Sequence, residues 1–254
     1  MCYDIQAKLQ SQLKRAKANN DHSSMLELTE KLERFLGKSL FHASGFDHPE
    51  LLIYPNSSKF LPIPAFWGLI PQWTTSRDQA RELWNKTLNA RGESIFEKAS
   101  FKDSAESKRC IIPIDGFFEH RHVKGNTIPY FIQREDNEPM NLAGLYSIWK
   151  NPASEESITT FTIVTEKANS LMSMIQNNPK IDGPRMPIIL ENSEIDVWLD
   201  SIDSQDIHEL LTKYPTVELK AHTVQKLKGA RSTGNEENVT DEFFYPELGP
   251  SLFN

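Results

Sequence analysis

Residues 109–119 read RCIIPIDGFFE, a run of β-branched and aromatic side chains interrupted by proline and glycine. Such composition is typical of a buried strand, and the proline and glycine favour a bend within it. Runs of the same character follow at 128–133, 142–149 and 158–164. Short consecutive runs of this kind predict a strongly curved, mainly antiparallel sheet with a barrel-like core.

Segments of helical spacing and of strand character flank these runs. Residues 41–72 are β-rich and punctuated by proline, which indicates short strands and ordered loops. Strand character returns at 186–190 and 217–222. Helical spacing predicts helices after Thr75, over 94–101, from Ala168, after Ser193 and after Ser204. We therefore predict one α+β domain over residues 1–254, with helices flanking the sheet.

The two ends of the chain have their own patterns. Ser24 and Glu27 have the form of a capping box, and Gly37 is suited to a helix C-cap. The last thirty residues, polar and then aromatic, predict an extended tail over 225–254. Near the N-terminus, apolar residues recur at helical spacing in two groups: Ile5, Leu9, Leu13 and Leu28, Leu32, Phe35, Leu36. This pattern predicts a helical hairpin over residues 4–36.

Composition and cysteine usage narrow the class of protein. No apolar run approaches the roughly 20 residues that span a bilayer, and the N-terminus lacks the order of a secretory signal. Cys2 and Cys110 are the only cysteines, which does not support a disulfide framework or a four-ligand zinc site. The seven histidines, including His120 and His122, show no metal-ligand spacing. We expect a soluble, cytoplasmic monomer with no metal and no organic cofactor.

Charge argues against a protein that coats nucleic acid. The net charge is −7, yet residues 77–134 carry 11 Lys and Arg against 8 Asp and Glu. A nucleic-acid site must therefore be a local groove rather than a whole positive face.

Cys2 directly follows the initiator Met1, and a small second residue permits removal of that methionine. The exposed cysteine then carries an α-amine and a thiol on adjacent carbons, with unperturbed pKa values of about 8 and about 8.5. An aldehyde reacts with such a pair to give an imine, which the thiol closes to a five-membered thiazolidine. This chemistry depends on the removal of Met1.

Five short segments follow the Met-Cys start in a specific order: WGLIP at 67–71, NARGE at 89–93, RCIIPIDGFFE at 109–119, AGLY at 143–146 and RMP at 185–187. With these motifs the chain resembles the SOS response-associated peptidases, the family of abasic-site processing proteins. The resemblance implies a compact β-rich fold that binds single-stranded DNA. It also implies a covalent link between the N-terminal cysteine and the open-ring aldehyde of an abasic site.

The resemblance assigns roles to individual residues. Cys2 is the expected nucleophile, Asn89 orients the sugar, and Glu119 lies beside the α-amine as general base and then acid. Arg91 is expected to bind a flanking phosphate, for which its fork of donors is suited, and Arg185 is a further expected DNA contact.

Aromatic residues near these motifs have two interpretations. Trp67 and Phe118 are equally suited to stacking on a base and to filling the core. Phe117 is predicted to be a core residue, and Cys110 a small buried hydrophobe rather than a second nucleophile.

The chain departs from the family pattern at two positions. The family places a histidine shortly before Arg-Met-Pro, and Gln176 is the nearest match here. Because glutamine cannot titrate near neutrality, this change bears on strand cleavage and crosslink reversal more than on DNA binding. His120 replaces a tryptophan, and we interpret it as a surface histidine because it follows Glu119 on the opposite face of the strand.

Two alternatives remain open from sequence. Cys2 and Glu119 would also serve an autoproteolytic thiol peptidase that removes Met1. The second alternative is a non-catalytic module that binds single-stranded DNA or a protein partner, with the arm at 4–36 as its recruiting element.

Under any interpretation that includes DNA binding, we expect the DNA-bound protein to associate with the nucleoid.

Overall fold

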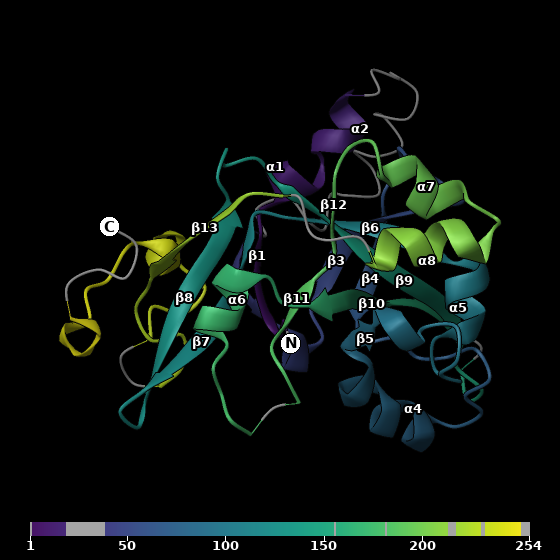
Figure 1. Ribbon diagram of the computed structural model, residues 1–254. Helices are drawn as coiled ribbons and strands as arrows, with labels where there is room; N and C mark the ends of the chain where they lie inside the picture. Colours follow the sequence, from purple (N-terminus) through teal and green to yellow (C-terminus); the bar gives the residue numbers. More distant parts are fainter. Residues whose placement is uncertain are drawn as a thin grey trace.

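The computed structural model describes residues 2–18, 39–154, 156–180, 182–212, 217–229 and 232–249. Its strands form two sheets (Figure 1). Those of the smaller sheet are β1 (Asp4–Ala7), β2 (Leu40–Ser44), β7 (Gly116–Val123), β8 (Asn126–Arg134) and β13 (Leu219–Thr223). Those of the larger sheet are β3 (Glu50–Pro55), β4 (Ile63–Trp67), β5 (Asn89–Arg91), β6 (Arg109–Ile114), β9 (Met140–Lys150), β10 (Ser157–Lys167), β11 (Arg185–Pro187) and β12 (Ile189–Leu190).

The larger sheet closes on itself. Its strands follow the order β11-β10-β4-β3-β6-β9-β12, and an additional pairing of β9 with β10 completes a ring of five strands. Within the ring only the β10–β4 pairing is parallel, with Thr160 opposite Phe66, and β5 also lies parallel to β10. The predicted α+β fold with a curved, mainly antiparallel, barrel-like core is confirmed.

Most helices gather on one side of the ring, to the right in Figure 1. In the described ranges none is long and apolar enough to cross a membrane. The described α-helices are α1 (Leu9–Gln12), α2 (Lys14–Ala18), α4 (Arg77–Trp84), α5 (Lys102–Ser107), α6 (Ser170–Ile175), α7 (Ile195–Asp200) and α8 (Ser204–Thr212). Of these, α4, α5, α7 and α8 lie at the right of Figure 1. The predicted helix over 94–101 is wrong. Ile95 and Phe101 both enter the core, and the chain between them runs as turns before α5 begins.

The smaller sheet has the order β13-β8-β7-β1-β2, and the place of β1 between β7 and β2 corrects the prediction for the N-terminus. Residues 4–7 are a strand rather than the start of a helix. β1 pairs on one side with β2 and on the other with β7, where Asp4 lies opposite Phe118. Both partners are distant in sequence, so the local spacing of Ile5, Leu9 and Leu13 could not reveal the pairing. The second predicted helix of the arm lies outside the described residues.

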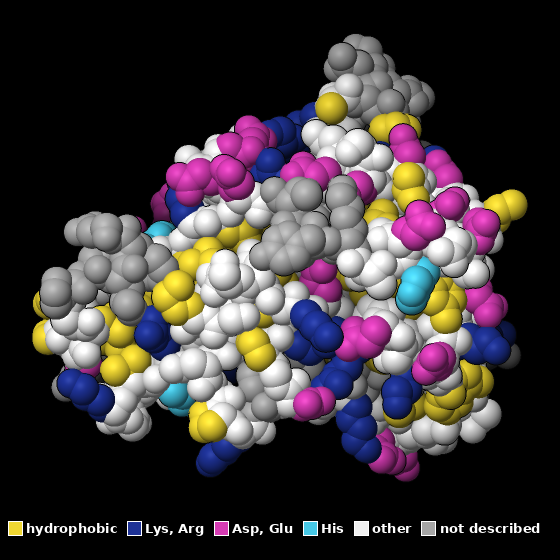
Figure 2. Space-filling view, viewed as in Figure 1, with side chains coloured by type: hydrophobic (Ala, Val, Ile, Leu, Met, Phe, Trp, Pro, Cys, Tyr) yellow, Lys and Arg dark blue, Asp and Glu magenta, His cyan; other side chains and the backbone are white. Residues whose placement is uncertain are grey.

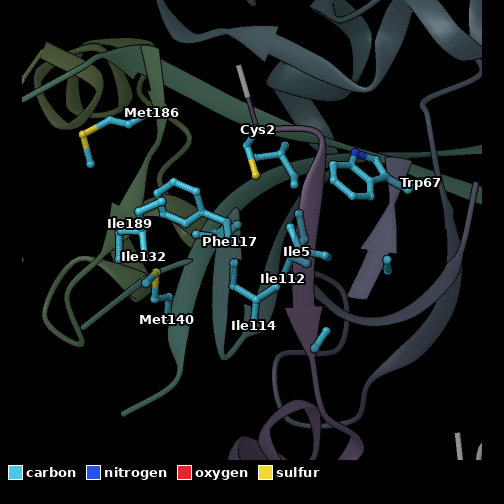
Figure 3. Packing of buried hydrophobic residues seen from close by; sticks show 14 of the residues in the cluster. Cys2, Ile5, Trp67, Ile112, Ile114, Phe117, Ile132, Met140, Met186 and Ile189 are labelled. Carbon is cyan, nitrogen blue, oxygen red and sulfur yellow. The ribbon is translucent and has the colours of Figure 1, made fainter. Parts of the chain in front are cut away.

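Alternate residues of the ring strands supply two apolar clusters. On β3, Leu51 and Ile53 join a cluster shared with the smaller sheet, whereas Leu52 and Tyr54 join a cluster beneath α7 and α8. Figure 3 shows Cys2 at the start of β1, within the first cluster and close to its aromatic members. The cysteine is therefore anchored to the core of the molecule rather than to a loose end.

The hairpin of β7 and β8 depends on a glycine inside the Ile-Asp-Gly-Phe segment. A Cβ added at Gly116 would lie 2.5 Å from the carbonyl oxygen of Ile132 and 2.4 Å from the ring of Phe131. Because the backbones approach so closely, only glycine fits at this position. This close packing fixes the start of the strand that carries Glu119.

The C-terminal segment packs beside the smaller sheet, at the left of Figure 1. Val224 bridges to Glu242, and the buried Tyr245 donates a hydrogen bond to the carbonyl of Val224 at 2.9 Å. Two short 3-10 turns, Glu237–Thr240 and Pro246–Leu248, interrupt the predicted extended tail.

Candidate active site

Four of the predicted site residues, Arg91, Glu119, Gln176 and Arg185, line a pocket of about 400 Å³ between β7, β11 and the segment that joins α6 to β11. We call it the site pocket. Side chains from the two sheets face each other across it, which brings together residues more than 180 positions apart in the chain. Its lining residues are Tyr3, Arg91, Glu119, His120, His122, Thr127, Gln176, Asn178, Asp182, Gly183 and Arg185.

Cys2 is held at the base of this region by β1 and by Asn89. The cysteine is buried, and the side-chain amide of Asn89 donates a hydrogen bond to its carbonyl oxygen at 2.8 Å. The amide oxygen of Asn89 is also buried and has no hydrogen-bond partner among the described residues. Asn89 therefore keeps one acceptor available beside Cys2.

Burial raises the pKa of the Cys2 thiol far above its ordinary value, and the nearby Glu119 carboxylate raises it further. At neutral pH the thiol is protonated. A reaction that begins with a thiolate is therefore disfavoured, whereas a thiol that adds after an amine has reacted is compatible with this environment.

Glu119 is the buried carboxyl of the pocket, with 9% of its surface exposed. One carboxylate oxygen accepts the backbone N–H of His120 at 2.9 Å, and the other accepts the side-chain amide of Gln176. Burial raises the pKa of Glu119, while the hydrogen bonds from His120 and Gln176 oppose the shift. Opposed influences of this kind suit a group that must exchange a proton near neutrality.

Arg185, a predicted DNA contact, lines the pocket but has its guanidinium engaged by other residues. Its guanidinium forms two hydrogen bonds of 2.7 Å to the carboxylate of Glu93 and one of 2.8 Å to the carbonyl of Thr165. Only 6% of the side chain is exposed, so these donors are engaged inside the protein. We name the three buried residues Glu119, Gln176 and Arg185 the pocket floor.

Arg91 is the exposed cation of the pocket. Its guanidinium contacts Asp182 at 3.1 Å, and the side chains of the two residues are 44% and 86% exposed. We name this pair the pocket rim. Figure 2 shows Lys and Arg gathered in the lower centre of the face that carries β5 and β11, whereas Asp and Glu concentrate along the upper edge. Among the residues that line the site pocket, Arg91 and Arg185 are matched in number by Glu119 and Asp182.

The model of the SOS response associated peptidase (SRAP) family matches residues 47–229. This chain belongs to that family. The abasic site processing protein YoqW of Bacillus subtilis is 34% identical over 176 residues, which cover 68% of this chain and 73% of YoqW. The abasic site processing protein HMCES of Gallus gallus is 28% identical over 76% of this chain and 60% of its own length.

Solved structures agree with this membership. A crystal structure of a protein from Bacteroides thetaiotaomicron has a TM-score of 0.81 at 31% identity, covering 96% of this chain and all of that one. A second, from Bordetella bronchiseptica, has a TM-score of 0.67 at 23% identity, over 88% of this chain and 99% of that one, and is similar in fold. The two-sheet architecture is thus found in experimental structures.

Two aromatic residues expected near DNA belong to the core of this SRAP protein. Trp67 is fully buried, stacks on Phe161 with ring centroids 6.2 Å apart, and donates from its indole N–H to Leu88. Phe118 is buried against Phe131. Neither ring presents a face on which a base can stack, so both residues fill the core, which is one of the two interpretations left open by the sequence. The prediction that Cys110 is a buried hydrophobe is confirmed.

His120 and Tyr3 line the site pocket although neither was predicted as a site residue. His120 lines the pocket and is half-buried rather than a plain surface residue, and burial lowers its pKa while Asp4 opposes the shift. Tyr3 also lines the pocket and was missed, although its position next to Cys2 was a usable signal. In the described ranges, no three His, Cys, Asp or Glu side chains gather in a way that could hold a metal ion.

Proposed function

We propose that this SRAP protein captures abasic sites in single-stranded DNA by forming a thiazolidine through Cys2, once Met1 has been removed. The names of its relatives YoqW and HMCES support abasic sites as the target. The observation that carries the proposal is the setting of Cys2, which Asn89 holds by its carbonyl while Glu119 lies close enough to perturb its thiol.

The reaction proceeds in balanced steps. Glu119 takes a proton from the α-ammonium of Cys2, and the free amine attacks the aldehyde carbon of the open sugar. Glu119 returns that proton to the hydroxyl of the carbinolamine, which leaves as water and gives a protonated imine. The thiol then adds to the imine carbon, and its proton passes to the nitrogen. One water is lost overall, and no oxidant or metal is required.

The remaining residues hold the substrate. The free amide oxygen of Asn89 accepts a hydroxyl of the sugar, and Arg91 binds a phosphate next to the abasic position. The protonated thiol of Cys2 argues against a thiol peptidase, because such an enzyme requires a lowered thiol pKa. Strand cleavage would need a further acid–base group, for which we propose no residue.

A denaturing gel tests the proposal. Protein whose loss of Met1 is verified by mass is incubated with a single-stranded oligonucleotide that contains one abasic site. We expect a shifted band that survives heating, that Cys2→Ala abolishes, and that Glu119→Gln slows by about a hundredfold or more. Cys110→Ala is the matched control, because it removes the other cysteine, which does not line the pocket, and should leave the band intact.

One further substrate and the processing of Met1 distinguish the alternatives. An oligonucleotide with a reduced abasic sugar lacks the aldehyde and should give no band. If processed protein binds this reduced strand but never forms a band with the aldehyde strand, the non-catalytic module is correct. If Met1 is lost only when Cys2 and Glu119 are both intact, the autoproteolytic activity is supported as well.

A further inference from the structure

Gln176 connects two parts of the pocket floor. It follows directly after α6 and is 5% exposed. Its amide oxygen accepts the backbone N–H of Arg185 at 2.5 Å, and its amide nitrogen donates to the carboxylate of Glu119. One side chain thus occupies the space between a peptide donor and a catalytic acceptor.

The orientation of this amide is fixed by its neighbours. Exchange of its oxygen and nitrogen would set an N–H against the N–H of Arg185 and an oxygen against the carboxylate of Glu119. Both contacts would be repulsive, so only the observed orientation satisfies the network. Gln176 can therefore only donate to Glu119, which favours the ionised form of that carboxyl over the protonated one.

The peptide N–H of Arg185 is itself held in place. The guanidinium of Arg185 donates hydrogen bonds to both carboxylate oxygens of Glu93 and to the carbonyl oxygen of Thr165, and these bonds fix the position of the residue. Because Arg185 is buried while about half of Glu93 is exposed, the pair anchors β11 to the segment after β5. The paired carboxylate at Glu93 thus acts on Glu119 through Arg185 and Gln176 without touching the substrate.

We propose that Glu93, Arg185 and Gln176 form a positioning chain that keeps Glu119 as a carboxylate, ready to accept the proton of the Cys2 ammonium. This inference rests on the proposed function and names what prepares its base. Other titratable groups lie beside Glu119 or line the same pocket. From the elements around the pocket they are Cys2, Tyr3, His120, His122, Arg91 and Asp182.

The test is the rate of crosslinking against pH at saturating abasic DNA. Gln176→Met keeps the length of the side chain without the donor, and Gln176→Glu sets a second carboxyl against Glu119. We expect the acidic limb of the profile to move to higher pH by about one unit in Gln176→Met, a tenfold loss of rate at a fixed acidic pH. The shift should be larger in Gln176→Glu and smaller in Glu93→Gln.

Glu97→Gln is the matched control, since it removes the same charge from an exposed position four residues beyond Glu93. Its profile should superimpose on that of the parent protein. If the Gln176 variants lose rate equally at every pH, their effect is merely structural and the positioning chain is refuted.

A second measurement needs neither DNA nor a folded variant at Gln176. The carboxyl infrared band of Glu119, identified by difference from Glu119→Gln, should be that of a carboxylate at pH 7 in the parent protein. A protonated band at pH 7 would overturn the inference. If no crosslink forms yet the carboxylate band is present, the proposed function fails while the positioning chain stands.

Discussion

The floor and the rim of the site pocket contain similar chemical groups in opposite settings. On the floor, Arg185 is 6% exposed and its guanidinium is engaged by Glu93 and Thr165. On the rim, Arg91 is 44% exposed and meets Asp182 through a single hydrogen bond. The two arginines of one pocket therefore have different settings: the donors of the buried one are engaged by neighbouring residues, and the exposed one is accessible from solvent.

This contrast follows from solvation. A buried guanidinium must be fully hydrogen-bonded, because an unpaired buried charge is costly. An exposed ion pair is worth little and is readily exchanged for another anion such as a phosphate. Changes on the floor should therefore alter stability and rate, whereas changes on the rim should alter binding.

The largest expected effect is a difference in the free energy of unfolding between two glycine substitutions, one at Gly116, which starts the strand that carries Glu119, and one at Gly183, next to Asp182 of the rim. Gly116→Ala forces a Cβ against the carbonyl of Ile132 and should lower the free energy of unfolding by about 3 kcal/mol. Gly183 has a φ of 72° and open space around it, so Gly183→Ala should cost only about 1 kcal/mol of backbone strain. Urea unfolding of both variants measures the difference, and equal costs would contradict the distinction.

The next effect concerns Arg91→Ala. Loss of one phosphate contact should weaken binding of undamaged single-stranded DNA about tenfold and reduce the salt slope of log K by about 0.7. The free energy of unfolding should change by no more than about 0.5 kcal/mol. Fluorescence anisotropy at several salt concentrations measures both the affinity and the slope.

Asp182→Asn is the companion to Arg91→Ala, because it releases the same arginine from its carboxylate. Affinity should rise a few-fold at low salt. A fall in affinity would mean that Asp182 orients Arg91 for the ligand instead of competing with it.

The smallest expected effect concerns the pH dependence of stability at Glu166, a carboxyl that interacts with Arg185 of the pocket floor. Burial raises the pKa of Glu166 to about 8, Arg185 opposes this shift, and Glu194 adds to it. An unfolded glutamate titrates near 4.3, so the extra stability is complete below about that pH and is lost as pH rises through about 8. Glu166→Gln should therefore gain about 2 °C in melting temperature relative to the parent between pH 5 and pH 9. A constant difference across that range would refute this.

Strand character was readable from sequence where it came from local composition. The runs at 109–119 and 142–149 are strands because their β-branched and aromatic residues suit a pleated, buried surface. The first run divides into β6 and β7 around Asp115, consistent with the proline and glycine that predicted a bend. Residues 4–7 were misread, since the pairing of β1 with β7 spans more than 100 positions and leaves no local pattern.

The sequence by itself determined which chemical groups this SRAP protein has: a cysteine after Met1, an amide at Asn89, a carboxyl at Glu119 and no titratable group at Gln176. Tertiary structure decided what surrounds each of them. Burial raised the pKa of the Cys2 thiol, withdrew Trp67 from solvent and distinguished Arg185 from the exposed Arg91. Residue identity is local, whereas solvation and hydrogen-bond partners depend on strands that meet only after the two sheets have packed together.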